Sequence, residues 1–250
     1  MVLRRWGAAL VLAAPWSLPL QAAVLQLAPI PIEVEAPQSA AVLSLGNRAS
    51  AEVALQVRVF RWTQEQYEDR LVPTQDVAIS PPIAVVPAGQ TLTVRVVRVA
   101  AQPVAAEETY RIWVDELPSA KSKPRKGQSL RILMRYSVPV YFEPADADAG
   151  EPKLAWQLTR SSKDKWTLTA VNRGQKRARI SGLQLYTPDG DVAAMPTGSE
   201  LSGYVLAGQR MRWTLKPPEN FPVVSGDLYR LSYQTETESH RERLLLDAGR

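Results

Sequence analysis

The side chains that most often carry out catalysis are scarce in this 250-residue chain, which has no cysteine and one histidine, His240. These counts exclude a thiol nucleophile, a disulfide framework, a Cys-ligated zinc or iron–sulfur cluster and a His-rich metal site. The sequence also has no Gly-x-Ser-x-Gly elbow, phosphate-binding glycine loop or His-Glu-x-x-His motif. Paired carboxylates such as Glu107-Glu108 and Asp115-Glu116 leave only glycosidase chemistry open. Because such pairs are common and mostly exposed, we expect no enzymatic activity and no cofactor.

A second candidate for chemistry is the Asp146-x-Asp148 spacing, which is also found at the start of calcium-binding loops. The loop pattern then fails, because its fifth position is Gly150 and its twelfth is Gln157, where a bidentate glutamate belongs. The segment is acidic, lacks large apolar residues and is bounded by prolines. We therefore interpret residues 145–152 as a linker and expect no metal site.

The chain has the sequence pattern of β-strands, and these strands must position any functional side chains. Residues 53–59 and 91–96 alternate apolar and polar side chains with a period of two, and no segment has a helical period. Residues rich in proline and glycine, which favour chain reversal, separate such runs at 80–82, 87–89 and 187–190. The sequence thus predicts an all-β protein built from β-sandwiches.

The linker divides the chain into a first domain, residues 23–144, and a second domain, residues 153–250. Residues 1–22 have two arginines, then an uncharged stretch and small residues, as in a secretory signal peptide. Two prolines and a length below the ~20 residues of a bilayer span argue against a membrane anchor. We therefore predict export, with no stable membrane insertion. The formal charge of +5 is too weak and too evenly spread to indicate nucleic-acid binding.

The segment from Ser129 to Phe142 distinguishes between possible functions. Its even positions from Leu130 onward are all apolar, and the row is far longer than a strand of ~5–6 residues. One interpretation is that this row is core and that the basic residues 119–128 before it form a solubilising hairpin. The other is that the first half of the row lies exposed at a sheet edge, where it can complete another protein's sheet by strand addition. The pattern alone leaves both interpretations open.

Several ordered motifs resemble those of one protein family. The sequences at 57–62, 80–83, 110–118 and 135–140, after a signal peptide, look like those of the periplasmic chaperones of chaperone–usher pilus assembly. The closest likeness is to the archaic branch. In the second domain, residues 170–185 fit more loosely.

The resemblance implies two immunoglobulin-like domains set at an angle, with the last long strand of the first domain as a donor strand. In that family a nascent pilus subunit lacks its final strand, and alternating hydrophobic chaperone side chains fill the open groove. Carried onto this chain, the donating positions are Leu130, Ile132 and Met134, while the later even residues pack inside the chaperone. The implied partners are a pilus or fimbrial subunit and an outer-membrane usher, the implied location is the periplasm, and no cofactor is required.

One departure from the family concerns the anchor for the subunit's C-terminal carboxylate. Conventional members use an arginine on the first strand and a lysine late on the donor strand, whereas the corresponding residues here are Pro31 and Pro139. If the carboxylate is still anchored, the candidate cations are Arg111 and Arg135. The alternative is that both are sheet-surface arginines paired with nearby carboxylates such as Asp115.

Two other functions are compatible with exported β-sandwiches. A structural pilus subunit or adhesin would lack a strand and fail to fold alone. A carbohydrate-binding sandwich would use some of the seven tryptophans. An exposed strand edge also favours self-association of the free protein.

Overall fold

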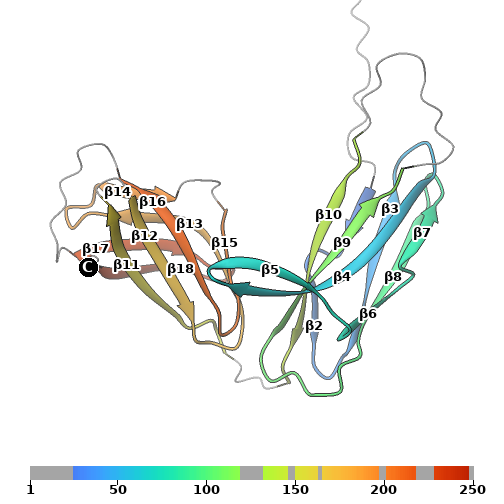
Figure 1. Cartoon of the computed structure of the whole chain (residues 1–250), viewed down its shortest axis with the longest axis horizontal. Helices are drawn as coiled ribbons and strands as arrows, with labels where there is room; N and C mark the ends of the chain where they lie inside the picture. The colour runs from blue at the N-terminus through green and yellow to red at the C-terminus, as the bar shows by residue number, and fades with distance from the viewer. Residues whose placement is uncertain are drawn as a thin grey trace, which may run out of the picture.

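The computed structural model describes residues 25–118, 132–145, 150–162, 165–196, 201–217 and 228–247. All eighteen regular elements in these ranges are β-strands, and they form two immunoglobulin-like sandwiches set at an angle to each other (Figure 1). The described part of the chain contains no helical segment of the length and hydrophobicity that crossing a bilayer requires. The predicted signal peptide, the predicted donor residue Leu130 and the centre of the predicted linker, residues 146–149, lie outside the described residues.

The first sandwich comprises ten strands in two sheets. They are β1 (Leu25–Ala28), β2 (Ile32–Glu35), β3 (Ala40–Asn47), β4 (Val53–Glu65), β5 (Glu68–Pro73), β6 (Val77–Ser80), β7 (Ile83–Val86), β8 (Thr91–Arg98), β9 (Glu108–Glu116) and β10 (Arg135–Glu143). One sheet has the order β1-β3-β8-β6, and the other has the order β2-β10-β9-β4-β5 with β7 paired to β4. All of these pairs are antiparallel except β2 with β10, which is parallel.

The second sandwich comprises eight strands. They are β11 (Leu154–Ser162), β12 (Lys165–Asn172), β13 (Ala178–Tyr186), β14 (Val192–Pro196), β15 (Leu201–Val205), β16 (Arg210–Lys216), β17 (Leu228–Gln234) and β18 (Ser239–Asp247). Their order is β14-β16-β12-β11-β18-β17-β13-β15. Because β14 also pairs with β13, the path of strands returns on itself around the core.

Each sandwich buries the inward-facing side chains of its alternating strands in its own apolar core. The predicted strands at 53–59 and 91–96 are the first half of β4 and most of β8. Both sandwiches also bury one asparagine at a strand end, Asn47 and Asn172, whose side-chain amides donate to backbone carbonyls of neighbouring turns. These amides satisfy carbonyls that would otherwise be buried without a partner.

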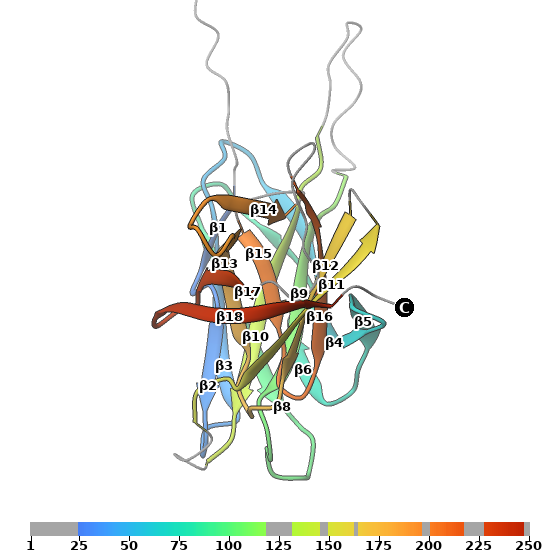
Figure 2. The same cartoon turned by 90° about the vertical axis from the view of Figure 1, so that its left-hand side faces the viewer.

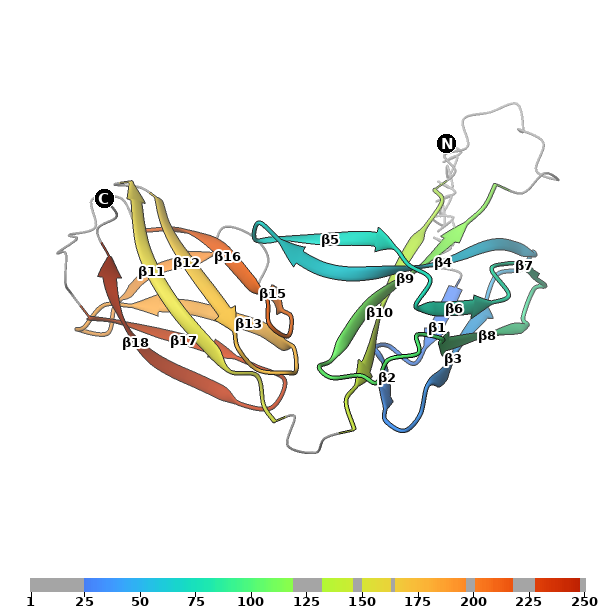
Figure 3. The ribbon, with the colours of Figure 1, turned by 60° about the horizontal axis from the view of Figure 1, so that its bottom comes forward.

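Strand β4 changes the face that it buries along its length. Leu55 and Val57 point into the first sandwich, as a period of two predicts, but further along the buried residues are Trp62 and Gln64. Figure 3 shows the reason: the hairpin of β4 and β5 extends beyond its own sandwich and reaches the second one. The far half of β4 therefore buries its even residues at the junction between the domains.

The hairpin is joined to the second domain by apolar and polar contacts. Trp62 packs in one cluster with Tyr141 of β10 and Leu206 of the second domain. The Gln64 side chain donates from Nε2 to the carbonyl oxygen of Tyr204 at 2.8 Å and accepts at Oε1 from the amide of Leu206 at 3.1 Å. The two domains are thus connected at a specific junction as well as by the chain between them.

The tip of the hairpin uses an unusual backbone for its residue types. Gln66 and Tyr67 have φ angles of 52° and 69°, between the paired residues Glu65 and Glu68. Two residues with positive φ are typical of a type I′ turn, which glycine or asparagine usually forms. The Tyr67 ring lies beneath the guanidinium of Arg212, with Cζ 3.7 Å from the ring centroid. This contact between domains favours the strained tip.

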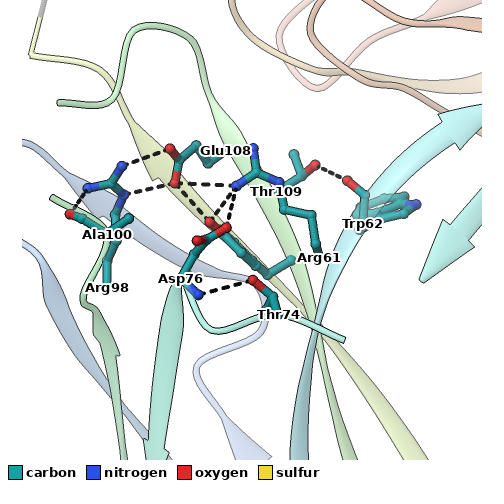
Figure 4. Close-up of polar contacts among 9 residues, drawn as sticks. Arg61, Trp62, Thr74, Asp76, Arg98, Ala100, Glu108 and Thr109 are labelled. Carbon is teal, nitrogen blue, oxygen red and sulfur yellow. Dashed lines mark hydrogen bonds and ion pairs between the residues drawn. The ribbon is translucent and has the colours of Figure 1, made fainter. Parts of the chain in front are cut away.

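A polar network connects the two sheets of the first sandwich near the junction (Figure 4). Arg98 donates from Nε and Nη2 to the two carboxylate oxygens of Glu108, at 2.8 Å each. Tyr110 donates its hydroxyl to Glu108 at 2.9 Å, and Arg61 donates to the Tyr110 oxygen at 2.7 Å. Burial acts to raise the pKa of Glu108, but the hydrogen bonds from Arg98 and Tyr110 outweigh it and hold that pKa below its ordinary value. Glu108 is therefore committed to this network.

Candidate functional site

Strand β10 has one edge that is only partly covered. β9 pairs with it over Arg135–Phe142, whereas β2 pairs with it only over Val140–Glu143. Among the described strands, none pairs with the other edge of Arg135–Pro139. That edge is continuous with the segment that enters β10 from residue 132.

The hydrogen bonds of β10 determine which backbone groups face the uncovered edge. The amide of Glu116 donates to the carbonyl of Met134 at 3.0 Å, so the even residues of β10 are directed toward β9. The odd residues Arg135 and Ser137 then direct their N–H and C=O groups to the uncovered side. Pro139, the next odd residue, has no N–H to offer. A partner strand can therefore find donors on this edge only before Pro139.

The apolar side chains predicted to donate lie at the start of this edge. Ile132 is 68% exposed and Met134 is 41% exposed, and Leu133 between them is exposed as well. Strand β10 begins only at Arg135, so residues 132–134, at the exposed start of the apolar row, are not in a strand.

The later even residues of the row turn inward. Val138 and Val140 are fully buried in the core of the first sandwich, and Tyr136 packs against that core. The apolar row therefore has two parts, an exposed part before β10 and a core part within it. The sequence pattern is the same in both parts, and only the surrounding strands distinguish them.

Arg111 lies on β9 at the junction, directly opposite Pro139 in the β9–β10 ladder. Its guanidinium stacks on the buried Trp62 ring, with Cζ 3.8 Å from the ring centroid, and is 5.7 Å from the centroid of Tyr204. No carboxylate in the described ranges forms an ion pair with it. A guanidinium held on an aromatic face keeps its donors available for a carboxylate.

Arg135 has a different environment. It pairs with Asp115, which also accepts from Arg58 at 2.6 Å, and its Cζ lies 4.1 Å from the ring centroid of Trp113. Burial acts to raise the pKa of Asp115, but hydrogen bonds from Arg135 and Arg58 outweigh it and hold that pKa below its ordinary value. Arg135 is thus a sheet-surface arginine with a carboxylate partner.

The structure does not bring the two candidate anchors together. Their positions lie on one face of the sheet, four ladder positions apart, which corresponds to roughly 13 Å along the strands. Only Arg111 lies at the junction of the domains. Of the two prolines that replace the family's anchor residues, Pro139 is the ladder partner of Arg111, and Pro31 directly precedes β2.

The sequence interpretation missed the charged residues that hold the junction. Arg177, just before β13, pairs with Glu107 and Glu33, and its Cζ lies 3.5 Å from the ring centroid of Tyr141. The Glu107 side chain is fully buried, and burial raises its pKa although Arg177 acts to lower it. Nearby, Lys176 donates to Glu143 at 2.8 Å. No sequence signal could reveal these pairs, because their members are far apart in the chain.

The carboxylate pairs considered for glycosidase chemistry do not converge. Glu107, directly before β9, pairs with Arg177 at the junction, whereas Glu108, the first residue of β9, pairs with Arg98 in the network between the two sheets. Within the described residues, no three His, Cys, Asp or Glu side chains come together as a metal site.

An incompletely paired strand edge on a sandwich is the kind of surface to which another chain can add a strand. The chain belongs to the pili and flagellar-assembly chaperone family, because the sequence model for its PapD N-terminal domain matches residues 24–148, half of the chain. Members of this family are chaperones of pilus assembly, and this protein shares that function. The alternatives of a structural subunit and a carbohydrate-binding sandwich are thereby set aside.

Solved structures with the same fold include complexes of chaperones with their subunits. The chain is 23% identical, with a TM-score of 0.67, to a chain of the CsuC–CsuE chaperone–tip adhesion subunit pre-assembly complex from archaic Csu pili of Acinetobacter baumannii, covering 90% of this chain and 99% of that one. The CupB2 chaperone of Pseudomonas aeruginosa is 15% identical with a TM-score of 0.57, and the match covers 88% of this chain and 100% of that one. A chain of the SafA pilin–SafB chaperone complex of Salmonella enterica is 19% identical with a TM-score of 0.57. The match covers 89% of this chain and 96% of that one. A comparison with curated proteins gives no match.

Proposed function

We propose that this chaperone works in the periplasm, holds a pilus subunit by donor-strand complementation and delivers it to an outer-membrane usher. Leu130, Ile132 and Met134 are the donating side chains in this proposal. The observation that carries it is the exposure of Ile132 and Met134 directly before the uncovered edge of β10. Complexes of similarly folded chaperones with a tip adhesion subunit and with a pilin support the choice of client.

The energetics of such binding follow from burial and backbone pairing. A fully buried aliphatic side chain contributes about 1.5–3 kcal/mol, so Ile132 and Met134 together add several kcal/mol when a client groove covers them. The N–H and C=O groups of Arg135 and Ser137 add main-chain hydrogen bonds along the edge. No covalent bond forms, so another strand that packs better can displace this one.

Arg111 is the proposed anchor for the client's C-terminal carboxylate. It lies beside Pro139, where the row of edge donors ends, and its guanidinium is stacked on Trp62 without a carboxylate partner in the described residues. Charge-assisted hydrogen bonds to a carboxylate are about twice as strong as neutral ones. Arg135 is the weaker candidate, because Asp115 already holds it.

The test is recovery of a chaperone–client complex after co-expression with a pilus subunit from the same organism. Ile132→Asp and Met134→Asp place a charge where the client needs an apolar side chain, so we expect recovery to fall by at least about tenfold. Val99→Asp is the matched control, because Val99 is 56% exposed but lies away from the edge. Arg111→Ala should reduce recovery, whereas Arg95→Ala, on an exposed part of β8, should not.

Thermal unfolding of each purified variant shows that the fold is retained. Undiminished recovery with both aspartate variants would remove the donor segment from the proposal. Undiminished recovery with Arg111→Ala alone would remove only the anchor.

A further inference from the structure

The second sandwich carries an outward-facing set of arginines that the chaperone function does not use. Arg230 on β17 lies directly opposite Arg243 on β18, and Arg241 is the next outward residue of β18, opposite Ser232. All three arginine side chains are exposed. We call these three residues the arginine face.

The charge of the arginine face is not neutralised by the protein. Side chains directly opposite each other on antiparallel strands are about 5 Å apart, and like charges there are destabilising. In the ranges that the structure describes, no carboxylate forms an ion pair with any of the three. Glu242, between Arg241 and Arg243, points to the other side of the sheet and accepts from the Tyr233 hydroxyl at 2.7 Å.

Two acidic residues flank Gly190, in the turn between β13 and β14. Asp189 and Asp191 are exposed there and pair with none of the arginines. An uncompensated arrangement of like charges costs stability, so a ligand with negative charge would relieve it.

A hollow of about 270 Å³ lies beside these arginines. It is lined by Arg230, Arg241, Ser232, Tyr186 and Gly190. Gly190 has a φ of 100°, and a Cβ there would come within 3.5 Å of the Arg230 guanidinium. The hollow thus combines two guanidinium groups and a hydroxyl, which are donors suited to a phosphate group.

Apolar side chains flank the arginine face. Leu228 and Leu245, which pair across β17 and β18 next to Arg230 and Arg243, are 48% and 63% exposed. Val192, exposed on β14, pairs with Tyr186 on β13. Exposed aliphatic residues, a tyrosine and arginines on one surface have the composition of a protein face that lies on a bilayer interface.

We propose that the arginine face docks peripherally on a bilayer surface that contains anionic phospholipid. Phosphate headgroups would bind the arginines and the hollow, while Leu228, Leu245 and Val192 would contact the acyl boundary. The flanking aliphatic side chains, beside the arginines on one surface, are suited to the acyl boundary of a lipid surface.

The arginine face lies away from the elements that hold the client in our proposal. The hairpin contacts the second domain through Tyr204, Leu206 and Arg212 of β16, whereas the arginine face lies on the outward side of β17 and β18 (Figures 2 and 3). The chaperone could therefore bind a client and a membrane surface at the same time. The proposal does not depend on the donor segment.

The test is partitioning of the purified chain between buffer and vesicles. One set of vesicles contains phosphatidylcholine alone, and the other also contains roughly one-third phosphatidylglycerol. Any contribution from the apolar N-terminal residues is common to all variants. Arg230→Ser, Arg241→Ser and Arg243→Ser combined should weaken binding to the anionic vesicles by about a hundredfold, at about 1 kcal/mol per arginine.

The matched control removes three exposed arginines elsewhere, through Arg70→Ser, Arg95→Ser and Arg173→Ser. It has the same net charge as the test variant and should retain binding within about threefold. The variant with Leu228→Ser and Leu245→Ser should lose the residual binding that remains at high salt.

Three results would overturn the proposal. The first is equal binding of the unsubstituted chain to both vesicle types. The second is an equal loss in the two triple variants, which would show an effect of net charge alone. The third is tighter binding to soluble polyglutamate than to anionic vesicles, which would assign the face to an acidic protein.

Discussion

Replacing Arg177 by methionine tests the charged junction between the domains. The substitution keeps much of the side-chain volume but removes the partner of Glu107, whose side chain is fully buried. Glu107 would retain only the backbone N–H of residue 177, which donates to it at 3.0 Å. A buried carboxylate without its charge partner is strongly destabilising.

The expected loss is about 3–5 kcal/mol in the free energy of unfolding at pH 7. For a chain of this size, each kcal/mol lowers the Tm by about 2–4 °C, so the Tm should fall by about 6–20 °C. Replacing both partners, with Arg177→Met and Glu107→Gln together, should recover part of the loss because no charge remains buried.

The loss should also depend on pH. Burial already raises the pKa of Glu107, and removing Arg177 takes away a group that lowers it. A carboxyl whose pKa is higher in the folded than in the unfolded state favours folding at low pH, and this contribution disappears as the pH rises through the folded pKa. The gap in stability between the unsubstituted chain and Arg177→Met should therefore narrow as the pH falls from 7 toward the ordinary value of 4.5.

Urea unfolding followed by tryptophan fluorescence measures both effects. The control is Arg179→Met, two residues away on β13 and exposed, which should change stability by less than about 0.5 kcal/mol. If Arg177→Met and Arg179→Met are equally stable, or if the gap widens in acid, the interpretation of Glu107 and Arg177 as a buried pair is refuted.

Two other substitutions test the parts around the site. Gln64→Ala removes the side-chain bonds to Tyr204 and Leu206, so chemical denaturation should show a loss of about 1–3 kcal/mol, and an unchanged stability would contradict the role of the hairpin as a connection between domains. The lowered pKa of Asp115 supplies stability above its ordinary value of 3.8, and that stability is lost as the pH falls through the lowered pKa. Asp115→Asn should therefore lose less stability on acidification than the unsubstituted chain, and parallel pH profiles in a thermal-shift assay would contradict the paired state of Asp115.

Much of the fold could be predicted from local sequence. The period of two in β8 and in the first half of β4 reflects one buried and one exposed face, and this pattern needs no knowledge of the partner strands. The second half of β4 could not be assigned to a face in this way. Its buried residues Trp62 and Gln64 face a different domain. Which of its alternate residues are buried therefore depends on contacts with residues about 140 positions away in the chain.

The candidate site was also predictable only where local alternation of apolar and polar residues determines it. The parity of Ile132 and Met134 follows from the apolar row, but the row itself does not show where it changes from exposed to buried, which in the structure lies between Met134 and Val138. Arg111 and Arg135 have similar sequence contexts, and only the structure separates an arginine stacked at the junction from one paired with Asp115.

The reach of the β4–β5 hairpin has a consequence for how a client would be received. Because Trp62 and Gln64 already contact the second domain, the two domains keep their relative orientation before a client binds. Ordering two loosely tethered bodies at the moment of encounter would consume part of the affinity, and here that ordering is completed when the chain folds. A fragment that ends at the linker would lose the Gln64 bonds to Tyr204 and Leu206 and would expose the side of the Trp62 indole that packs on the second domain, so it would make a poor substitute for the whole molecule.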